Sequence, residues 1–349
     1  MEQHIHGGDI THYDHCIDYS TNINPLGTPE SVKAAARDSL DNLTVYPQPD
    51  ERTLRHKIAE KEGFAPSQVV CGNGATGILF SLARALRPKE TLLTAPAFAE
   101  YERAVRVVDS RVRFFMRHEE EGFALTRDYL DELTEHVDLA FLCNPNNPDG
   151  TLIEEGLLMD ILERSSQKNI RLVMDECFLD MVPGGEKRSL TPLLAKYKNV
   201  FVLKAFTKTY GLAGLRLGYG LTRDKELLSL LADQFIPWQI SGPAQAAGIA
   251  ALSEDAFLEQ GRQIVQEQKK VLYALLEEMG YKYYPSEANY ILFEAPLSLF
   301  QDCARRGILL RDCSNFKGLK PGYYRIAVKS AQDNEKLISV FREVAAKGR

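Results

Sequence analysis

Lys208 and Arg216 lie eight residues apart in the segment TKTYGLAGLRLGYG (207–220), which is otherwise rich in glycine and apolar residues. A lysine amine can form a Schiff base with an aldehyde and can move protons at a substrate carbon. An arginine beside it can hold a phosphate group. A lysine at the end of a strand can also simply extend to solvent. The pair therefore indicates a functional site only together with other suitable residues.

Two polar residues follow other buried strands. Asp175 follows the apolar residues of IRLVMDE, and Asn147 lies in FLCNPNNPDG after an apolar run. The first could cap a helix and the second could belong to a plain proline-rich loop. In an open α/β sheet, however, ligands bind at the carboxyl ends of the strands. There Asp175 could face a protonated ring nitrogen, and Asn147 could present its amide to the same ligand.

A glycine-rich turn, VVCGNGATG, precedes a predicted helix. Its glycines, Gly72, Gly74 and Gly77, match the spacing of a dinucleotide-binding turn and make a nicotinamide-dependent dehydrogenase an alternative interpretation. That motif also needs an acidic residue about 20 positions further on, and the next strand, TLLTAPAF, ends without one. What remains is a helix N-terminus whose free N–H groups can bind a phosphate.

In chain order, these pieces are a glycine turn, an amide, a carboxylate, a lysine and an arginine along one sheet edge. Together they predict a site for pyridoxal phosphate (PLP). The lysine would hold the aldehyde, the acid would keep the pyridine nitrogen protonated, and the helix N-terminus with the arginine would hold the phosphate.

Seven short apolar runs between residues 67 and 222 alternate with helix-length amphipathic segments. This alternation predicts an α/β fold in which helices flank a mainly parallel sheet. In TPESVKAAARDSL, Thr28 is expected to cap a helix that has Pro29 at its first position. Residues 241–275 are predicted to be mainly helical, and shorter strands follow Tyr281. We therefore expect an N-terminal arm and helix packing on the small domain over 1–45, a large PLP-binding domain over 46–240 and a smaller α+β domain over 241–349.

The composition of the chain argues against several kinds of partner and site. The formal net charge is −6 and no basic stripe is present, so nucleic acid is not an expected partner. The six cysteines lack CxxC spacing, the first residues do not resemble a signal peptide, and no run of about 18 apolar residues occurs, so a cytoplasmic location is predicted. Four of the seven histidines, His4, His6, His12 and His15, lie near the start. We expect no metal site there, because they lack cysteine or acidic ligands at regular spacing.

Nearly the whole chain resembles the fold-type I, aspartate-aminotransferase-like PLP enzymes, and TKTYGLAGLRLGYG is close to their lysine motif. The resemblance implies that Lys208 is the Schiff-base lysine, that Asp175 pairs with the pyridine nitrogen and that Asn147 faces the ring hydroxyl. It implies further cofactor contacts from Phe98, stacked on the ring, and from a phosphate-binding cup of Gly74, Ala75, Thr207 and Arg216. Tyr46 matches a tyrosine that reaches the cofactor of a second subunit, which implies a homodimer.

Two positions depart from that family's pattern. Ala205 stands where many members have a hydroxyl that contacts the phosphate, and Phe178 stands where many have a tyrosine bonded to the ring hydroxyl. Neither change removes an essential group. The second should alter how the ring hydroxyl and the imine are tuned.

The segments HGGDI, YSTNINPLGTPESVK, APAFAEY, DECFLD and ILLRDCSNFKGL point to a narrower resemblance, to the threonine-phosphate decarboxylases of cobalamin biosynthesis. It implies that Arg325 takes the substrate carboxylate, that Arg311 and His6 take its phosphate, and that Asn24 shapes the pocket wall. The histidinol-phosphate aminotransferases share much of this pattern and are the alternative. A PLP-binding sensor domain would need an attached effector module, for which the chain has no room.

Overall fold

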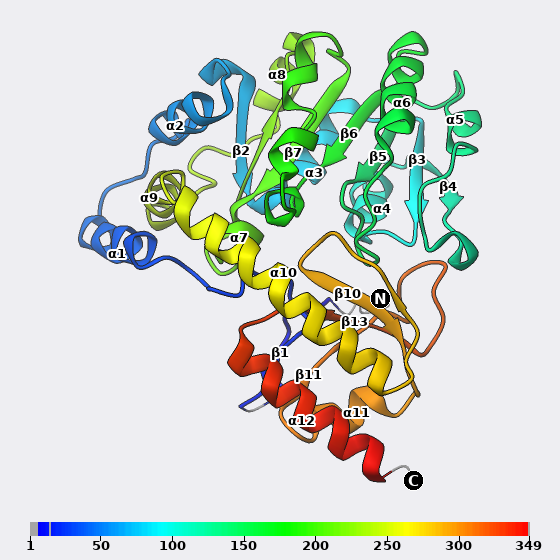
Figure 1. Cartoon of the computed structure of the whole chain (residues 1–349). Coiled ribbons are helices and arrows are strands. Elements are labelled where there is room, and N and C mark those ends of the chain that lie inside the picture. Colours follow the sequence, from blue (N-terminus) through cyan, green and yellow to red (C-terminus); the bar gives the residue numbers. More distant parts are fainter. Residues whose placement is uncertain (1–5, 14, 348–349) are drawn as a thin grey trace.

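The computed structural model describes residues 6–13 and 15–347. Its centre is a seven-stranded sheet with the strand order β2-β8-β7-β6-β5-β3-β4 (Figure 1). Six of these strands run in the same direction and only β8 runs in the opposite one, so the prediction of a mainly parallel sheet is confirmed. Six of the seven strands lie within one of the predicted apolar runs, and β2 extends one residue beyond its run: β2 Val69–Asn73, β3 Glu90–Ala95, β4 Arg111–Met116, β5 Leu139–Cys143, β6 Arg171–Asp175, β7 Val200–Ala205 and β8 Leu217–Leu221.

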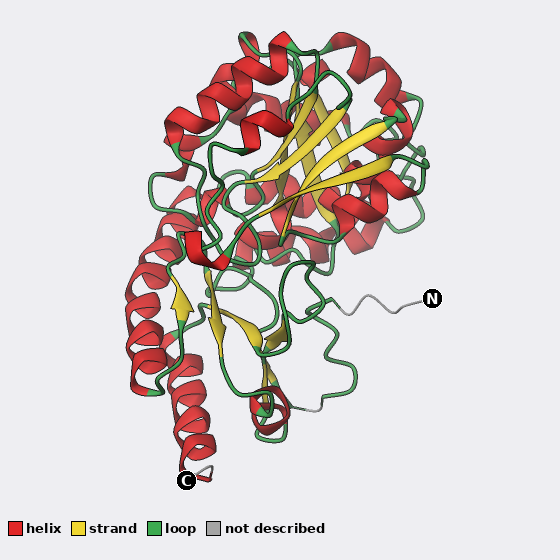
Figure 2. Ribbon diagram, turned by 90° about the vertical axis from the view of Figure 1, so that its right-hand side faces the viewer, coloured by secondary structure: helices red, strands yellow, loops and turns green. Residues whose placement is uncertain are grey.

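Helices cover both faces of this sheet (Figures 1 and 2). Successive side chains of a strand point to opposite faces, so in β6 Leu172 and Met174 enter one core and Val173 enters the other. The first core also takes residues of α2, α6 and α9, and the second takes residues of α3, α4 and α8. The helices of this unit are α2 Arg52–Glu62, α3 Gly74–Leu86, α4 Glu100–Arg106, α5 Tyr129–Glu132, α6 Glu155–Gln167, α7 Phe206–Thr209, α8 Lys225–Ala232 and α9 Gly242–Ala251.

A smaller unit lies below the sheet in Figure 1. Its four-stranded sheet has the order β12-β13-β10-β9, and a separate parallel pair joins β1 to β11. In the larger of these sheets Arg311 of β12 lies directly opposite Arg325 of β13. The elements are β1 Ile17–Asp18, β9 Tyr283–Tyr284, β10 Tyr290–Glu294, β11 Ile308–Leu309, β12 Arg311–Asp312, β13 Tyr323–Ala327, α10 Asp255–Glu278, α11 Leu299–Ala304 and α12 Ala331–Lys347.

The N-terminal segment contacts both units. Its β1 pairs with β11 of the small unit, whereas Val32 of α1 (Glu30–Asp38) shares the core of the large sheet with Ala244 and Ala247 of α9. The domain limits at 45/46 and 240/241 stay predictions. The expected cap of α1 is wrong: no side chain caps this helix, and the Thr28 hydroxyl donates instead to the carbonyl of Gly211 at 3.0 Å. Within the described residues, no helix has the length and apolar character to cross a membrane.

The direction of β8 explains why Lys208 and Arg216 belong together. Lys208 follows the end of β7, and β8 then runs back along β7. The start of β8 therefore lies at the same sheet edge as the ends of β5, β6 and β7. The strand begins at Leu217, so Arg216 lies in the turn before it with a φ of +56° and not inside the strand-like run.

Candidate active site

A cavity of about 450 Å³ opens at this edge, between the large sheet and the small unit. Its walls come from chain segments that are far apart in sequence. Most of the residues predicted for the site line it: His6, Ala75, Phe98, Asn147, Asp175, Thr207, Lys208, Arg216, Arg311 and Arg325. The lining does not include Gly74, Asn24 or Tyr46.

Lys208 lies on α7, a helix of four residues that follows β7 directly. Its side chain is half-buried, and its Nζ lies 5.6 Å from the centre of the Phe178 ring. Burial and the nearby charge of Arg325 lower the pKa of Lys208 to about 8. This amine therefore loses its proton more readily than an ordinary lysine, and the uncharged amine is the form that attacks an aldehyde.

Asp175 ends β6 with its carboxylate held in place by two donors. The backbone N–H of Cys177 donates to Oδ1 at 2.9 Å, and the hydroxyl of Tyr101 donates to Oδ2 at 2.6 Å. Burial raises the pKa of Asp175, and these hydrogen bonds act against that rise because they favour the ionised form. A fixed, buried carboxylate suits a cationic partner such as a protonated ring nitrogen.

Tyr101 is a site residue that the sequence analysis missed. Its ring stacks on Phe141 at 5.4 Å and meets the edge of Phe98 at 5.6 Å, so its hydroxyl is aimed at Asp175. The signal in the sequence was its position three residues after Phe98, because the Tyr101 N–H donates to the carbonyl of Phe98 at 3.3 Å in the turn that leads into α4. Tyr101 thus joins the residue predicted to stack on the cofactor ring to the residue predicted to pair with its nitrogen.

The glycine turn and Arg216 form a tight cradle. Gly74 has a φ of +71°, and its N–H donates to the carbonyl of Arg216 at 2.9 Å. A Cβ at Gly74 would lie 2.6 Å from an Arg216 side-chain nitrogen, and a Cβ at Gly218 would lie 2.5 Å from the backbone nitrogen of Ala75. Glycine is therefore needed at both positions to let the arginine approach the N-terminus of α3, and this cradle is suited to an anion.

Arg325 and Asn147 bridge the two units. Nη1 of Arg325 donates to the side-chain oxygen of Asn147, and Nη2 donates to the carbonyl of Ser20 at 2.7 Å. The guanidinium also lies 5.3 Å from the centre of the Tyr290 ring. Burial is the main reason why the pKa of Arg325 falls to about 10.

Arg311 lies opposite Arg325 and is also buried. Its guanidinium donates to the carbonyl of Asp312 and, at 2.8 Å, to the side chain of Asn315, and it lies 5.2 Å from the centre of the Phe316 ring. Among the described residues, no carboxylate oxygen lies within 4.0 Å of either guanidinium. Two positive charges therefore meet at this cavity with no carboxylate in direct contact, although Asp18 and Asp312 act on them from further away.

Three predicted residues have protein partners of their own. Nε2 of His6 lies 2.8 Å from the carboxylate of Glu100. The side chain of Asn24 donates to the carbonyl of Thr209 at 2.9 Å, so it contacts the backbone of α7 and not the cavity. Tyr46 is 78% exposed and packs on Trp238, with 4.8 Å between the ring centres.

Comparison with known proteins identifies the family of the chain. Residues 14–341 match the family described as aminotransferase class I and II. The chain belongs to this family. Its fold is accordingly the fold-type I architecture, and membership removes the nicotinamide-dependent dehydrogenase as an interpretation of the glycine turn.

Individual relatives come from two groups. The chain is 35% identical to a threonine-phosphate decarboxylase of Salmonella typhimurium over 97% of this chain and 96% of that protein. It is 34% identical to a histidinol-phosphate aminotransferase of a Geobacillus species, over 94% and 90% respectively. Among solved structures, the histidinol-phosphate aminotransferase of Clostridium acetobutylicum superposes with a TM-score of 0.88 at 28% identity, over 94% of this chain and 99% of that one.

Enzymes of this family depend on PLP, and the residues at this edge fit that cofactor. In the cradle, a Cβ at Gly74 would lie 2.6 Å from an Arg216 side-chain nitrogen, so the guanidinium lies directly against the N-terminus of α3, where an anion would meet both. The buried carboxylate of Asp175 is fixed and suits a pyridinium nitrogen, and the Lys208 amine has a lowered pKa. These residues supply an acceptor, a nucleophile and an anion site, which are the three groups that PLP requires.

Proposed function

We propose that this chain decarboxylates L-threonine O-3-phosphate, or a close phospho-amino acid such as serine phosphate, to the corresponding amino-alcohol phosphate, as used for the nucleotide loop of cobalamin. The observation that carries the proposal is the pair Arg311 and Arg325, buried and directly opposite each other without a carboxylate partner. Like charges in this arrangement repel. A substrate that has both a carboxylate and a phosphate would neutralise them.

The proposed roles follow from these positions. Arg325 binds the substrate carboxylate, while Arg311 and His6 bind its phosphate, since guanidinium and imidazole N–H groups donate to oxyanions. PLP, when bound, accepts the electron pair released by cleavage at the substrate's Cα. Asp175 holds a proton on the ring nitrogen, and the Lys208 amine returns a proton to the substrate carbon.

Different residues would contact different parts of the cofactor. Phe98 would cover the ring, Asn147 would face its hydroxyl, and Phe178 leaves that hydroxyl without a phenol partner. The phosphate would lie in the cup formed by Gly74, Ala75, Thr207 and Arg216. Asn24 would act indirectly, because its side chain donates to the carbonyl of Thr209 in α7.

A histidinol-phosphate aminotransferase is the second candidate. The 34% identity to such an enzyme favours it, and its substrate would also place a phosphate near Arg311. The two reactions would differ in which bond at the substrate's Cα is cleaved, and Arg311 and Arg325 would select that bond by where they hold the substrate's anionic ends.

One experiment separates the two candidates. The PLP-loaded protein is incubated with L-threonine phosphate, with serine phosphate, and with histidinol phosphate plus 2-oxoglutarate, while carbon dioxide and glutamate are measured. We expect carbon dioxide from threonine phosphate without any keto acid. Glutamate production from the third mixture, with no carbon dioxide from the first two, would replace the decarboxylase by the aminotransferase.

We also propose that the chain works as a homodimer in the cytoplasm. The support is a group of exposed apolar side chains around Tyr46: Leu40, Leu43, Val45, Ile236 and Trp238. Tyr46 lies outside its own cavity and would reach the cofactor phosphate of the partner subunit. Sedimentation should then give twice the chain mass of 39.2 kDa, and Tyr46→Ala should weaken PLP retention. A fully active species at the mass of one chain would contradict the dimer.

A further inference from the structure

Two lysines near the end of β7, Lys204 and Lys208, have surroundings of different charge. Lys204 lies inside the strand, is 7% exposed, and places its Nζ 3.1 Å from Glu62 and 3.8 Å from Asp180. Burial alone would lower the pKa of Lys204, but these acidic groups outweigh burial and raise it. Lys204 therefore stays charged at the pH at which Lys208, four residues later, can lose its proton. The predicted chemistry uses Lys208 but gives Lys204 no role.

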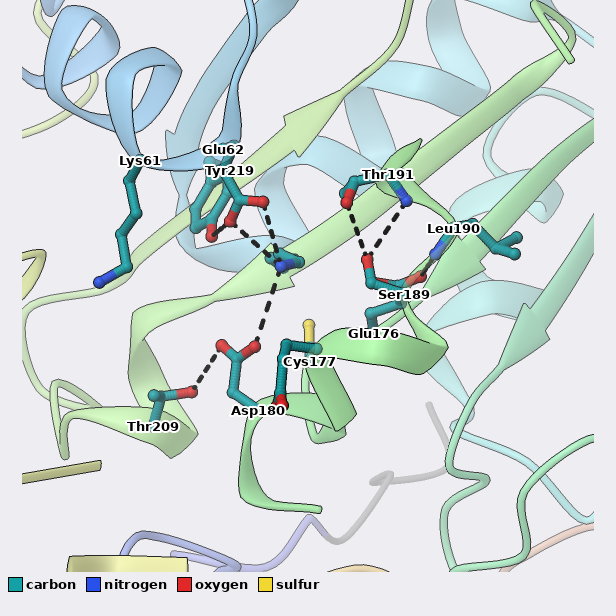
Figure 3. A network of polar contacts seen from close by, with 12 residues as sticks. Lys61, Glu62, Glu176, Cys177, Asp180, Ser189, Leu190, Thr191, Thr209 and Tyr219 are labelled. Carbon is teal, nitrogen blue, oxygen red and sulfur yellow. Dashed lines mark hydrogen bonds and ion pairs between the residues drawn. The ribbon is translucent and has the colours of Figure 1, made fainter. Parts of the chain in front are cut away.

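Lys204 is the centre of a largely buried network on the face of the sheet covered by α2. Figure 3 labels its partners Glu62 and Asp180, together with Tyr219. We call Glu62, Asp180, Lys204 and Tyr219 the charge cluster. Glu62 is the last residue of α2, and the Tyr219 hydroxyl from β8 donates to it at 2.6 Å. Asp180 lies in the short turn Leu179–Met181 that follows β6. The charge cluster thus connects a helix, two strands and a turn that are distant in sequence.

Asp180 connects this cluster to the helix of Lys208. The hydroxyl of Thr209, the residue after Lys208, donates to Asp180 Oδ2 at 3.4 Å (Figure 3). On the other side, Asn24 donates through its backbone N–H to the carbonyl of Lys208 and through its side chain to that of Thr209, both at 2.9 Å. A helix of one turn does not stabilise itself in isolation. The position of α7 is therefore set by these contacts and by its connection to β7.

The segment that carries Asp180 also carries two residues of the site. Asp175 begins it, and Phe178 places its ring beside the Lys208 amine and against Tyr290, 5.0 Å away between ring centres. The backbone carbonyl of Asp180 accepts from Arg262 of α10 at 2.7 Å. Movement of Asp180 would therefore act on Phe178 and on α7 together.

We propose that the charge cluster is a positioning device that holds α7, and with it the Lys208 amine, in register with the segment that carries Asp175 and Phe178. Lys204 and Asp180 are positioning residues, because neither of them lines the cavity. The inference rests on Lys208 as the PLP-binding residue. It does not depend on which reaction follows.

Thr209→Val is the decisive variant, with Thr209→Ser as its matched control. Valine removes only the hydroxyl that reaches Asp180 and leaves every charge in place, whereas serine keeps that hydroxyl. Lys204→Met is less suitable alone, because it leaves the partly buried Glu62 and Asp180 without their counter-charge and should destabilise the fold.

The measurement uses the PLP-loaded enzyme. The absorbance of the Lys208–PLP linkage is titrated with pH, and the rate of PLP release is followed after dilution. We expect Thr209→Val to shift the apparent pKa of the linkage by about half a unit or more, which is about a threefold change in its protonation equilibrium, and to release PLP faster. Thr209→Ser should restore both values.

A native titration curve and a native release rate in Thr209→Val would overturn the proposal, even if the variant unfolds at a lower temperature. These readouts are also separate from the reaction. If threonine phosphate is not decarboxylated while the linkage still shifts, the proposed function fails and the positioning role stands.

Discussion

Lys208→Ala should lose turnover by on the order of 10⁴-fold or more, because the variant lacks both the amine that holds the cofactor and the base that moves the substrate proton. It should also lose the imine absorbance that the native protein shows with PLP. In the native protein we expect the rate of imine formation to rise as the pH increases through about 8, the pKa of Lys208, and to level off above it, since only the uncharged amine reacts.

Lys269 offers a matched control for this prediction. Burial lowers its pKa to about 8 as well, but its amine donates to the carbonyl of Ser286 at 2.8 Å, and it does not line the cavity. Lys269→Ala should therefore keep imine formation and most of the turnover. Imine absorbance retained in Lys208→Ala but lost in Lys269→Ala would show that a lowered pKa had been mistaken for a catalytic position.

The second large effect is expected for Arg311→Met. If Arg311 binds the substrate phosphate, its removal should cost about 2–5 kcal/mol of transition-state binding, as for other buried charged contacts, and kcat/KM should fall accordingly. The melting temperature of the substrate-free protein should stay the same or rise, because Arg311 faces Arg325 and meets no carboxylate. Loss of activity without loss of stability is the mark of a ligand-binding arginine.

Arg117 is the contrasting control. It is also buried, but it lies 3.8 Å from Asp149 and donates to the carbonyl of Phe123 and the hydroxyl of Thr151. Arg117→Met should lower stability by about 3–5 kcal/mol, because it leaves Asp149 buried without a counter-charge. If Arg311→Met melted at a lower temperature with kcat/KM unchanged, Arg311 would have the structural role that we assign to Arg117.

Much of the large sheet could be predicted from sequence because its strands are buried on both faces. Runs such as NVFVLKAF and IRLVMDE are nearly continuous in apolar residues, and the polar residue that follows each run marks the strand end. Lys208, Asp175 and Asn147 were predicted for one edge for this reason. The cavity lining brings them together.

Contacts that depend on three-dimensional position could not be predicted from the sequence. No local pattern shows that the hydroxyl of Tyr101 reaches Asp175, or that the two residues of β12 place Arg311 opposite Arg325. Thr28 had the type and place of a helix cap, but its hydroxyl donates to Gly211, far along the chain. Lys204 resembled an ordinary strand residue because its partners come from α2 and from the turn after β6.

The place of β8 in the sheet also bears on the order in which the molecule assembles. Early in synthesis β2 has no neighbour, because its partner is β8, and Asn73 pairs with Leu217. Contacts between residues so distant in sequence form late, since the intervening chain must first be ordered. The bond between Gly74 and Arg216 that completes the anion cradle belongs to the same late pairing. The nascent chain is thus expected to acquire its cofactor-binding capacity only as the last strand enters the sheet.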